Sequence, residues 1–147
     1  MKIAVIGAGN GGQSIAGYLA LQGHKVCLYD INSQKINTLK QQGGIQLTGC
    51  IKGFGKIDCF TTDIGEAVKD VEIIMVTTIA NAHYAVAESL APYVKDGVTI
   101  ILNPGRTCGA LVFKQALKKS GVNCQYYLAE AQTLVYACRL ICNGQVN

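Results

Sequence analysis

The sequence predicts an α/β protein built on a doubly wound, mostly parallel sheet, and two observations carry this prediction. Segments with the pattern of buried strands alternate with helical segments along nearly all of the 147 residues, which is typical of a sheet with helices wound over both faces. Hydrophobic residues make up 50% of the composition, as strands buried on both faces require. A chain of this length forms one domain with a substantial core.

The first strand, the first helix and the second strand carry a glycine pattern. Strand 2–6 runs directly into Gly7-Ala8-Gly9-Asn10-Gly11-Gly12, a helix over 11–22 follows, and strand 25–29 ends beside Asp30. Asp30 lies 23 positions after Gly7, close to the spacing of about 20 residues at which an acid binds the ribose of a dinucleotide. This context predicts a Rossmann-type dinucleotide-binding site. The alternative is a plain glycine turn with Asp30 as the cap of the next helix.

Each residue of the turn has a physical role in this prediction. Gly7 permits the tight turn, Gly9 lets the backbone approach a pyrophosphate, and Gly12 lets the helix lie close to the strand. The backbone N–H groups of Asn10, Gly11 and Gly12 are expected to point at the phosphates, where the helix dipole is positive.

The acid after the second strand indicates the kind of nucleotide. The carboxylate of Asp30 can accept hydrogen bonds from two ribose hydroxyls but repels a 2′-phosphate. The next residues, Ile31 and Asn32, supply no compensating cation. The expected cofactor is therefore NAD(H) in preference to NADP(H).

The rest of the chain continues the alternation. The predicted elements are helix 33–42, ended by Gly43-Gly44, a short β-hairpin of 45–49 and 56–60 inserted into the wound sheet, a short helix after a capping box of Asp63 and Glu66, strand 71–77, helix 80–94, strand 98–102, helix 107–119, and a sixth strand over 124–128.

Ligand contacts are expected at the carboxyl ends of the strands, where doubly wound sheets bind their ligands. Beyond the glycine turn, this edge predicts cofactor contacts from Thr77, Thr78 and Asn103 and substrate contacts from Arg106, Gln132 and Thr133. Arg106 is the only cation in these segments, so it either receives a carboxylate or is a solvated surface arginine. Thr107 is predicted to be the N-cap of its helix, and His83 to lie on a helix surface near the cofactor edge.

Charge and hydropathy exclude two classes of partner. The net charge of +4 is spread along the chain, whereas nucleic-acid binding requires clustered cations. No apolar run approaches the roughly 18 residues of a membrane span. Because the first strand begins at Lys2 and leaves no room for a signal peptide, a cytoplasmic protein is expected.

The seven cysteines are best interpreted as reduced thiols. Cys27 and Cys124 fall in predicted strands, the number is odd and no C-x-x-C occurs. Cys138 and Cys142 could bind a metal only with a second ligand pair, which the sequence does not supply, so no metal site is predicted.

Several segments together resemble one enzyme family. The glycine turn, Gly23-His24, Ala82-His83, Leu102-Asn103-Pro104-Gly105-Arg106-Thr107 and Ala129-Glu130-Ala131-Gln132-Thr133-Leu134 are similar to the amino-terminal NAD-binding domain of the opine dehydrogenases of the octopine and nopaline type. The resemblance covers essentially the whole chain. It implies an NADH-dependent enzyme that reduces the imine formed between a 2-oxo acid and an amino acid. Cys108 stands where the family often has glycine.

The resemblance also implies a domain that this chain does not contain. In the family, a second, mostly helical domain supplies the catalytic His and Asp, and neither His24 nor His83 matches that histidine. We therefore expect residues 1–147 to be the NAD-binding domain, with no catalytic residue of its own. Residues 134–147 are expected to lead toward the missing catalytic domain, and either that domain or a homo-oligomer partner is expected to cover this apolar segment.

Two other functions remain open from the sequence alone. One is a stand-alone NAD-binding module that senses or regulates without turnover, although such a module has no need of the Asn-Pro-Gly-Arg-Thr segment. The other is S-adenosylmethionine-dependent methyl transfer, which shares the glycine turn and the acid but leaves the third glycine and the later segments unexplained.

Overall fold

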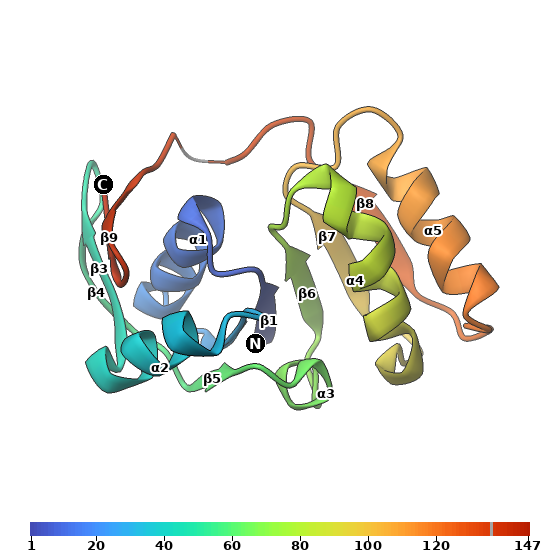
Figure 1. The fold of residues 1–147 in the computed structure, drawn as a ribbon, viewed down its shortest axis with the longest axis horizontal. Helices are drawn as coiled ribbons and strands as arrows, with labels where there is room; N and C mark the ends of the chain where they lie inside the picture. Colours follow the sequence, from blue (N-terminus) through green and yellow to red (C-terminus); the bar gives the residue numbers. More distant parts are fainter. Residues whose placement is uncertain (136) are drawn as a thin grey trace.

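The computed structural model describes residues 1–135 and 137–147 and is built around one six-stranded parallel sheet (Figure 1). The strands lie in the order β5 (Cys59–Thr61), β2 (Lys25–Tyr29), β1 (Lys2–Ile6), β6 (Ile73–Val76), β7 (Thr99–Leu102) and β8 (Tyr127–Glu130). The order reverses between β1 and β6, so the carboxyl ends of these two strands flank the crevice where doubly wound sheets bind ligands. The predicted fold class is confirmed.

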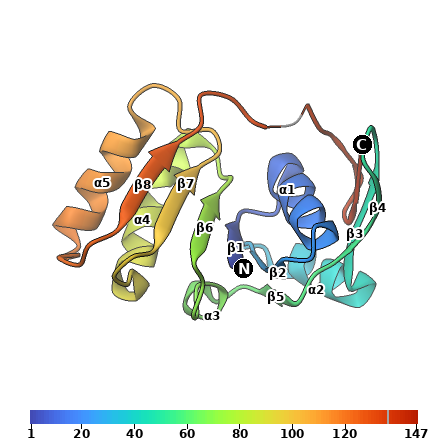
Figure 2. The ribbon, with the colours of Figure 1, turned by 180° about the vertical axis from the view of Figure 1, so that it is seen from behind.

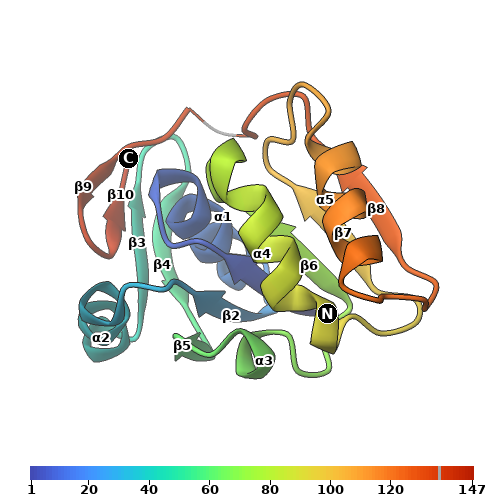
Figure 3. The same ribbon diagram turned by 45° about the vertical axis from the view of Figure 1, so that its right-hand side comes forward.

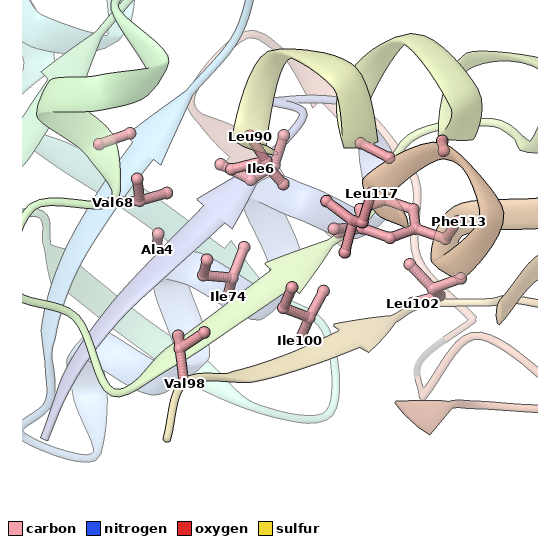
Figure 4. Close-up of a cluster of buried hydrophobic side chains, with 14 of the residues drawn as sticks. Ala4, Ile6, Val68, Ile74, Leu90, Val98, Ile100, Leu102, Phe113 and Leu117 are labelled. Carbon is pink, nitrogen blue, oxygen red and sulfur yellow. The ribbon is translucent and has the colours of Figure 1, made fainter. Parts of the chain in front are cut away.

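Helices cover both faces of this sheet (Figure 3). Helices α1 (Asn10–Leu21) and α2 (Ser33–Gln42) pack on one face. Helices α3 (Ile64–Ala67), α4 (His83–Leu90) and α5 (Gly109–Lys119) pack on the other. Figure 4 shows how Ile74, Ile100 and Leu102 of the strands meet Leu90 of α4 and Phe113 and Leu117 of α5, all fully or almost fully buried. The site edge therefore rests on a rigid, two-sided core.

The predicted hairpin is present, but its second strand and its place in the fold were wrong. Strand β3 (Gly44–Thr48) pairs antiparallel with β4 (Lys52–Lys56) in a second sheet of order β4-β3-β10-β9, which packs on α1 (Figure 2). Cys59 and Phe60, expected in the hairpin, instead join the main sheet in β5, parallel to β2. The switch occurs at Asp58, whose carboxylate accepts a hydrogen bond from Val26 N at 2.9 Å and whose N–H donates to Val26 O at 3.0 Å.

Other boundaries also differ from the predictions. The sixth strand runs over 127–130, not 124–128, because a turn in which Gln125 bonds Gly97 and Asp96 precedes it and leaves Cys124 outside the strand. The helix predicted over 80–94 is α4 between the 3₁₀ turns η1 (Ala80–Ala82) and η2 (Ala91–Tyr93).

The helix expected from Thr107 begins at Gly109. Arg106 and Cys108 have left-handed φ angles of 47° and 60°, which no α-helix accommodates. Cys108 is therefore the N-cap residue, and the prediction for Thr107 was wrong.

The last residues return to the first helix. Strand β9 (Leu140–Cys142) pairs antiparallel with β10 (Gln145–Val146), and β10 pairs parallel with β3. Gly144 N donates to Gln13 Oε1 at 2.8 Å, and Leu140 N donates to Asn10 Oδ1 at 3.0 Å. These bonds fix the first turn of α1 from the far end of the chain.

Candidate nucleotide-binding site

The glycine turn connects β1 to α1 with the closeness that the sequence predicts. Gly7 has a φ of 106°, a conformation that side chains disfavour. A Cβ added to Gly12 would lie 1.7 Å from Gly7 O, so the helix approaches the strand too closely for any side chain. At Gly9, by contrast, a Cβ would meet nothing within 4 Å. The open space beside Gly9 is where a pyrophosphate can approach the backbone.

The start of α1 faces this open space. The first N–H groups of a helix lack partners within it, and here they belong to Asn10, Gly11 and Gly12. A Cβ on Gly11 would lie 2.9 Å from the side chain of Leu134, so Gly11 also allows the segment after β8 to cross the helix start. The carboxamide oxygen of Asn10 is engaged by Leu140 N, which leaves the backbone N–H of Asn10 as its contribution to an anion site.

Asp30 lies at the end of β2 and is tied to the glycine turn. One carboxylate oxygen accepts from Ala8 N at 2.8 Å and the other from Asn32 N at 2.9 Å. Lys35 Nζ lies 3.0 Å from the first of these oxygens in an ion pair. Burial alone would raise the pKa of the Asp30 carboxyl, but the hydrogen bonds from Asn32 and Ala8 and the Lys35 ammonium outweigh it and lower the pKa below its ordinary value. Asp30 is therefore an anchored anion at neutral pH.

A groove of about 480 Å³ joins the glycine turn to Asp30 and to the start of α4. Its lining combines polar groups at one end with an apolar wall: Gly7, Gly9, Tyr29, Asp30, Ile31, Lys35, Ile64, Thr77, Thr78, Ile79, Ala82, Ala85, Val86 and Ser89. Thr77 Oγ1 donates within the turn, to Ile6 O or Gly7 O, at 3.0 and 2.8 Å. The buried Thr78 Oγ1 has no protein partner among the described residues. Such an unpartnered hydroxyl, beside an open glycine and an anchored acid, fits a nucleotide.

Asn103 directly follows β7 and is almost completely buried, at 2% exposure. Its amide nitrogen donates to Ile101 O at 3.0 Å, and its backbone N–H donates to Val76 O at 2.7 Å. Asn103 thus fixes the end of β7 beside β6, while its predicted contact with the cofactor stays a prediction.

The predicted substrate residues come together from two segments. Gly105 N donates to Ala131 O at 3.1 Å, which places the loop of Arg106 beside the segment of Gln132 and Thr133. All three side chains are exposed at the carboxyl edge of the sheet. The structure therefore supports the grouping of these residues and leaves Arg106 free to meet a ligand.

Glu130, the last residue of β8, contacts this loop, and the sequence analysis gave it no role of its own within the Ala129–Thr133 segment. Its Oε2 accepts from Ala110 N at 2.7 Å, at the start of α5. A Cβ on Gly105 would lie 2.2 Å from the Cβ of Glu130, so the loop is held directly against this side chain. The available signal was the acid at the end of the sixth strand, where a carboxylate can satisfy the N-terminus of the preceding helix.

His83 is buried, at 1% exposure, so its predicted position on a helix surface was wrong. Its ring packs edge-on against Phe113, with 6.4 Å between the centroids. Neither ring nitrogen has a hydrogen-bond partner among the described residues. The ring lies between α4 and α5, and a Cβ added to Gly109 would be 3.4 Å from its Nδ1, an ordinary contact distance.

The described residues contain no group of three or more His, Cys, Asp or Glu side chains placed to hold a metal ion. All seven cysteines are free thiols, and Cys27 is buried. Within the described part of the chain, no helix has both the length and the apolar character needed to cross a membrane.

Comparison with known proteins identifies the domain. The family model of the NAD-binding domain of 6-phosphogluconate dehydrogenase matches residues 2–122. The chain belongs to this family of NAD-binding domains. The expected NAD cofactor is confirmed. The glycine turn, Asp30 and the groove lie at the carboxyl edge of the sheet, beside the point where the strand order reverses.

Three relatives are informative. An opine dehydrogenase of Arthrobacter sp. (strain 1C) is 40% identical over 144 residues, which are 97% of this chain and 40% of that protein. A glycerol-3-phosphate dehydrogenase [NAD(P)+] of Agathobacter rectalis is 30% identical over 107 residues, or 68% of this chain and 30% of that protein. Octopine dehydrogenase solved with NADH and pyruvate superposes with a TM-score of 0.86 at 22% identity, over 99% of this chain and 39% of that one. The NAD-binding domain thus spans about two fifths of the length of its opine dehydrogenase relative.

Proposed function

We propose that the chain is the NAD-binding domain of an NADH-dependent oxidoreductase of the opine dehydrogenase type. The full-length enzyme would reduce the imine formed between a 2-oxo acid and an amino acid. The observation that carries the proposal is the 40% identity to an opine dehydrogenase over 97% of this chain. The joined loops of Arg106 and Gln132-Thr133, beside the nucleotide groove, support it.

The residues of this chain bind and orient in this proposal. Bound NADH supplies the hydride. Gly7, Gly9 and Gly12 form the turn that admits the pyrophosphate, and the N–H groups at the start of α1 donate to it. Asp30 accepts from the ribose.

On the substrate side, Arg106 receives the carboxylate of the 2-oxo acid, and Gln132 and Thr133 line the same edge. A charge-assisted hydrogen bond in a closed site is worth about 1.5–3 kcal/mol. We propose that Thr78, whose hydroxyl has no partner among the described residues, contacts the cofactor together with Thr77.

A catalytic acid and base would come from outside residues 1–147. We infer that a second domain covers the exposed apolar side chains of the segment after β8, such as Val135 and Ile141, each 59% exposed. A cytoplasmic location accompanies this proposal, as the expected place of an NADH-dependent reduction.

The test compares residues 1–147 with the full-length enzyme in an NADH-oxidation assay, using pyruvate and a panel of amino acids. Both proteins should bind NADH, and only the full-length enzyme should turn over, because positioning and general acid–base groups supply many orders of magnitude in rate. Amino-acid-dependent NADH oxidation by residues 1–147 alone would contradict the proposal that the catalytic acid and base lie outside this segment. NADH binding without turnover in the full-length protein would favour a sensor.

A further inference from the structure

The ribose end of the groove contains a cation that the strand-end pattern does not reveal. Lys35 lies in the first turn of α2, and its ammonium is 3.0 Å from Asp30 Oδ2. Asp30 and Lys35 are the only charged residues among the described residues that line the groove. The nucleotide therefore meets a carboxylate paired with an ammonium group instead of an isolated carboxylate.

The position of Lys35 is unfavourable for its own helix. A cation near a helix N-terminus opposes the dipole, which favours acids there. The backbone of Lys35 is nevertheless fixed at both polar groups, because its N–H donates to Asn32 Oδ1 at 3.0 Å and its carbonyl accepts from Asn143 Nδ2 at 2.9 Å. The side chain remains 30% exposed. The backbone of Lys35 is thus fixed, whereas its ammonium group can rotate toward or away from Asp30.

The donors around Asp30 limit what it can accept. Oδ2 already accepts from Ala8 N and Lys35 Nζ, and Oδ1 accepts from Asn32 N. A carboxylate offers about four acceptor sites, so one remains for a ribose hydroxyl while the ion pair is closed. When the ammonium turns away, a second site opens on Oδ2.

We propose that Lys35 determines nucleotide specificity by moving between Asp30 and a 2′-phosphate. With NADH, the ammonium stays at Asp30 or donates to a ribose hydroxyl. With NADPH, it leaves Asp30 and binds the 2′-phosphate, which offsets part of the repulsion from the carboxylate. The domain therefore accepts NADPH as a second nucleotide behind NADH. This inference rests on the proposed binding of NADH at the same groove.

The test uses the full-length protein and measures NADH and NADPH affinity by calorimetry in wild type, Lys35→Met and Lys40→Met. Lys40 lies in the last turn of the same helix, is exposed and lies outside the groove, so its variant is matched for helix and charge. Lys35→Met should weaken NADPH binding about tenfold, the lower end for a charge-assisted bond, because the site is partly exposed. NADH binding should change less than about threefold, and Lys40→Met should affect neither nucleotide.

A second measurement distinguishes the loss of the Lys35 charge from an effect of the substitution on folding. In wild type, raising the salt concentration should weaken NADPH binding more than NADH binding, since only NADPH forms the additional pair. This difference should shrink in Lys35→Met. An equal loss of both nucleotides, or an unchanged NADPH affinity, would overturn the role of Lys35. If the wild-type protein does not bind NADH at all, the proposed function is overturned instead.

Discussion

The closest backbone contact of the site provides the sharpest test of how the nucleotide turn is built. In Gly12→Ala, the new methyl group would lie 1.7 Å from Gly7 O and 2.7 Å from Thr77 Oγ1. Neither obstacle is the end of a flexible chain, because the first is backbone and the second donates to Ile6 O or Gly7 O. The helix must therefore move away from β1 by more than an ångström.

The cost of this movement can be worked from the contact. Overpacking costs typically about 1–3 kcal/mol, and a backbone obstacle places Gly12→Ala at the upper end. The helix propensity of alanine returns at most about 1 kcal/mol. A net loss of about 2–3 kcal/mol corresponds to a fall in Tm of roughly 5–10 °C for a domain of this size.

Thermal unfolding followed by circular dichroism measures the loss, and Gly9→Ala is the matched control. A Cβ on Gly9 meets nothing within 4 Å, and its φ of −81° suits alanine, so its Tm should change by less than about 4 °C. The same methyl group should reduce NADH affinity at least about tenfold, because it occupies the path of the pyrophosphate. A wild-type Tm for Gly12→Ala would refute the reasoning that helix–strand contact requires glycine here.

Four further predictions concern single side chains. Asp30→Asn should weaken NADH binding in calorimetry and reduce the preference for NADH. Because the pKa of Asp30 is lowered in the folded protein, the stability that its carboxylate contributes is complete above pH 3.8 and is lost as the pH falls through the folded pKa. The free energies of unfolding of wild type and variant should therefore converge at low pH in an acid titration. Arg106→Gln in the full-length enzyme should lower kcat/KM for the oxo acid roughly ten- to a hundredfold and leave NADH affinity unchanged; loss of NADH affinity instead would assign the side chain to the cofactor. Glu130→Ala should lower the stability by about 1 kcal/mol through the lost contact with Ala110 N and raise the KM for the oxo acid, whereas an unchanged KM would show that Glu130 does not position the loop. His83→Leu should leave Tm unchanged or raise it, since neither ring nitrogen has a hydrogen-bond partner to lose among the described residues, and a fall of several degrees would contradict this expectation.

The elements that the sequence predicted well are those with local signals. The strand, glycine turn and helix of residues 2–21 have a buried strand pattern, a turn signature and a helical period within one continuous stretch. The hairpin failed because its pairing depends on distant residues. Asp58 ends it by bonding Val26, and β10 completes its sheet from the other end of the chain, and neither contact leaves a signal near residue 56.

The site shows the same division. The open space at Gly9 and the anchored Asp30 follow from the motif. Lys35 was missed although its helix was predicted over the observed residues, because the sequence does not show that the first turn of this helix directs a side chain back toward Asp30. The helix start at Asn32, which caps α2, was the available signal. His83 could not be placed because its burial depends on packing against Phe113 of another helix, a contact that the sequence does not show.

The return of residues 140–146 to the first helix bears on how the domain folds. Gln13 bonds both Ala8 O and, across 131 positions, Gly144 N, so the nucleotide turn shares a network with the turn between β9 and β10, which is far from it in the sequence. Loop closure over such a separation is slow compared with local helix formation. During synthesis, helix α1 can form early, but the order of its first turn waits until β9 and β10 have been synthesised. The capacity to bind nucleotide should therefore appear late and abruptly as the chain lengthens, at the point where Val146 can pair with Leu47.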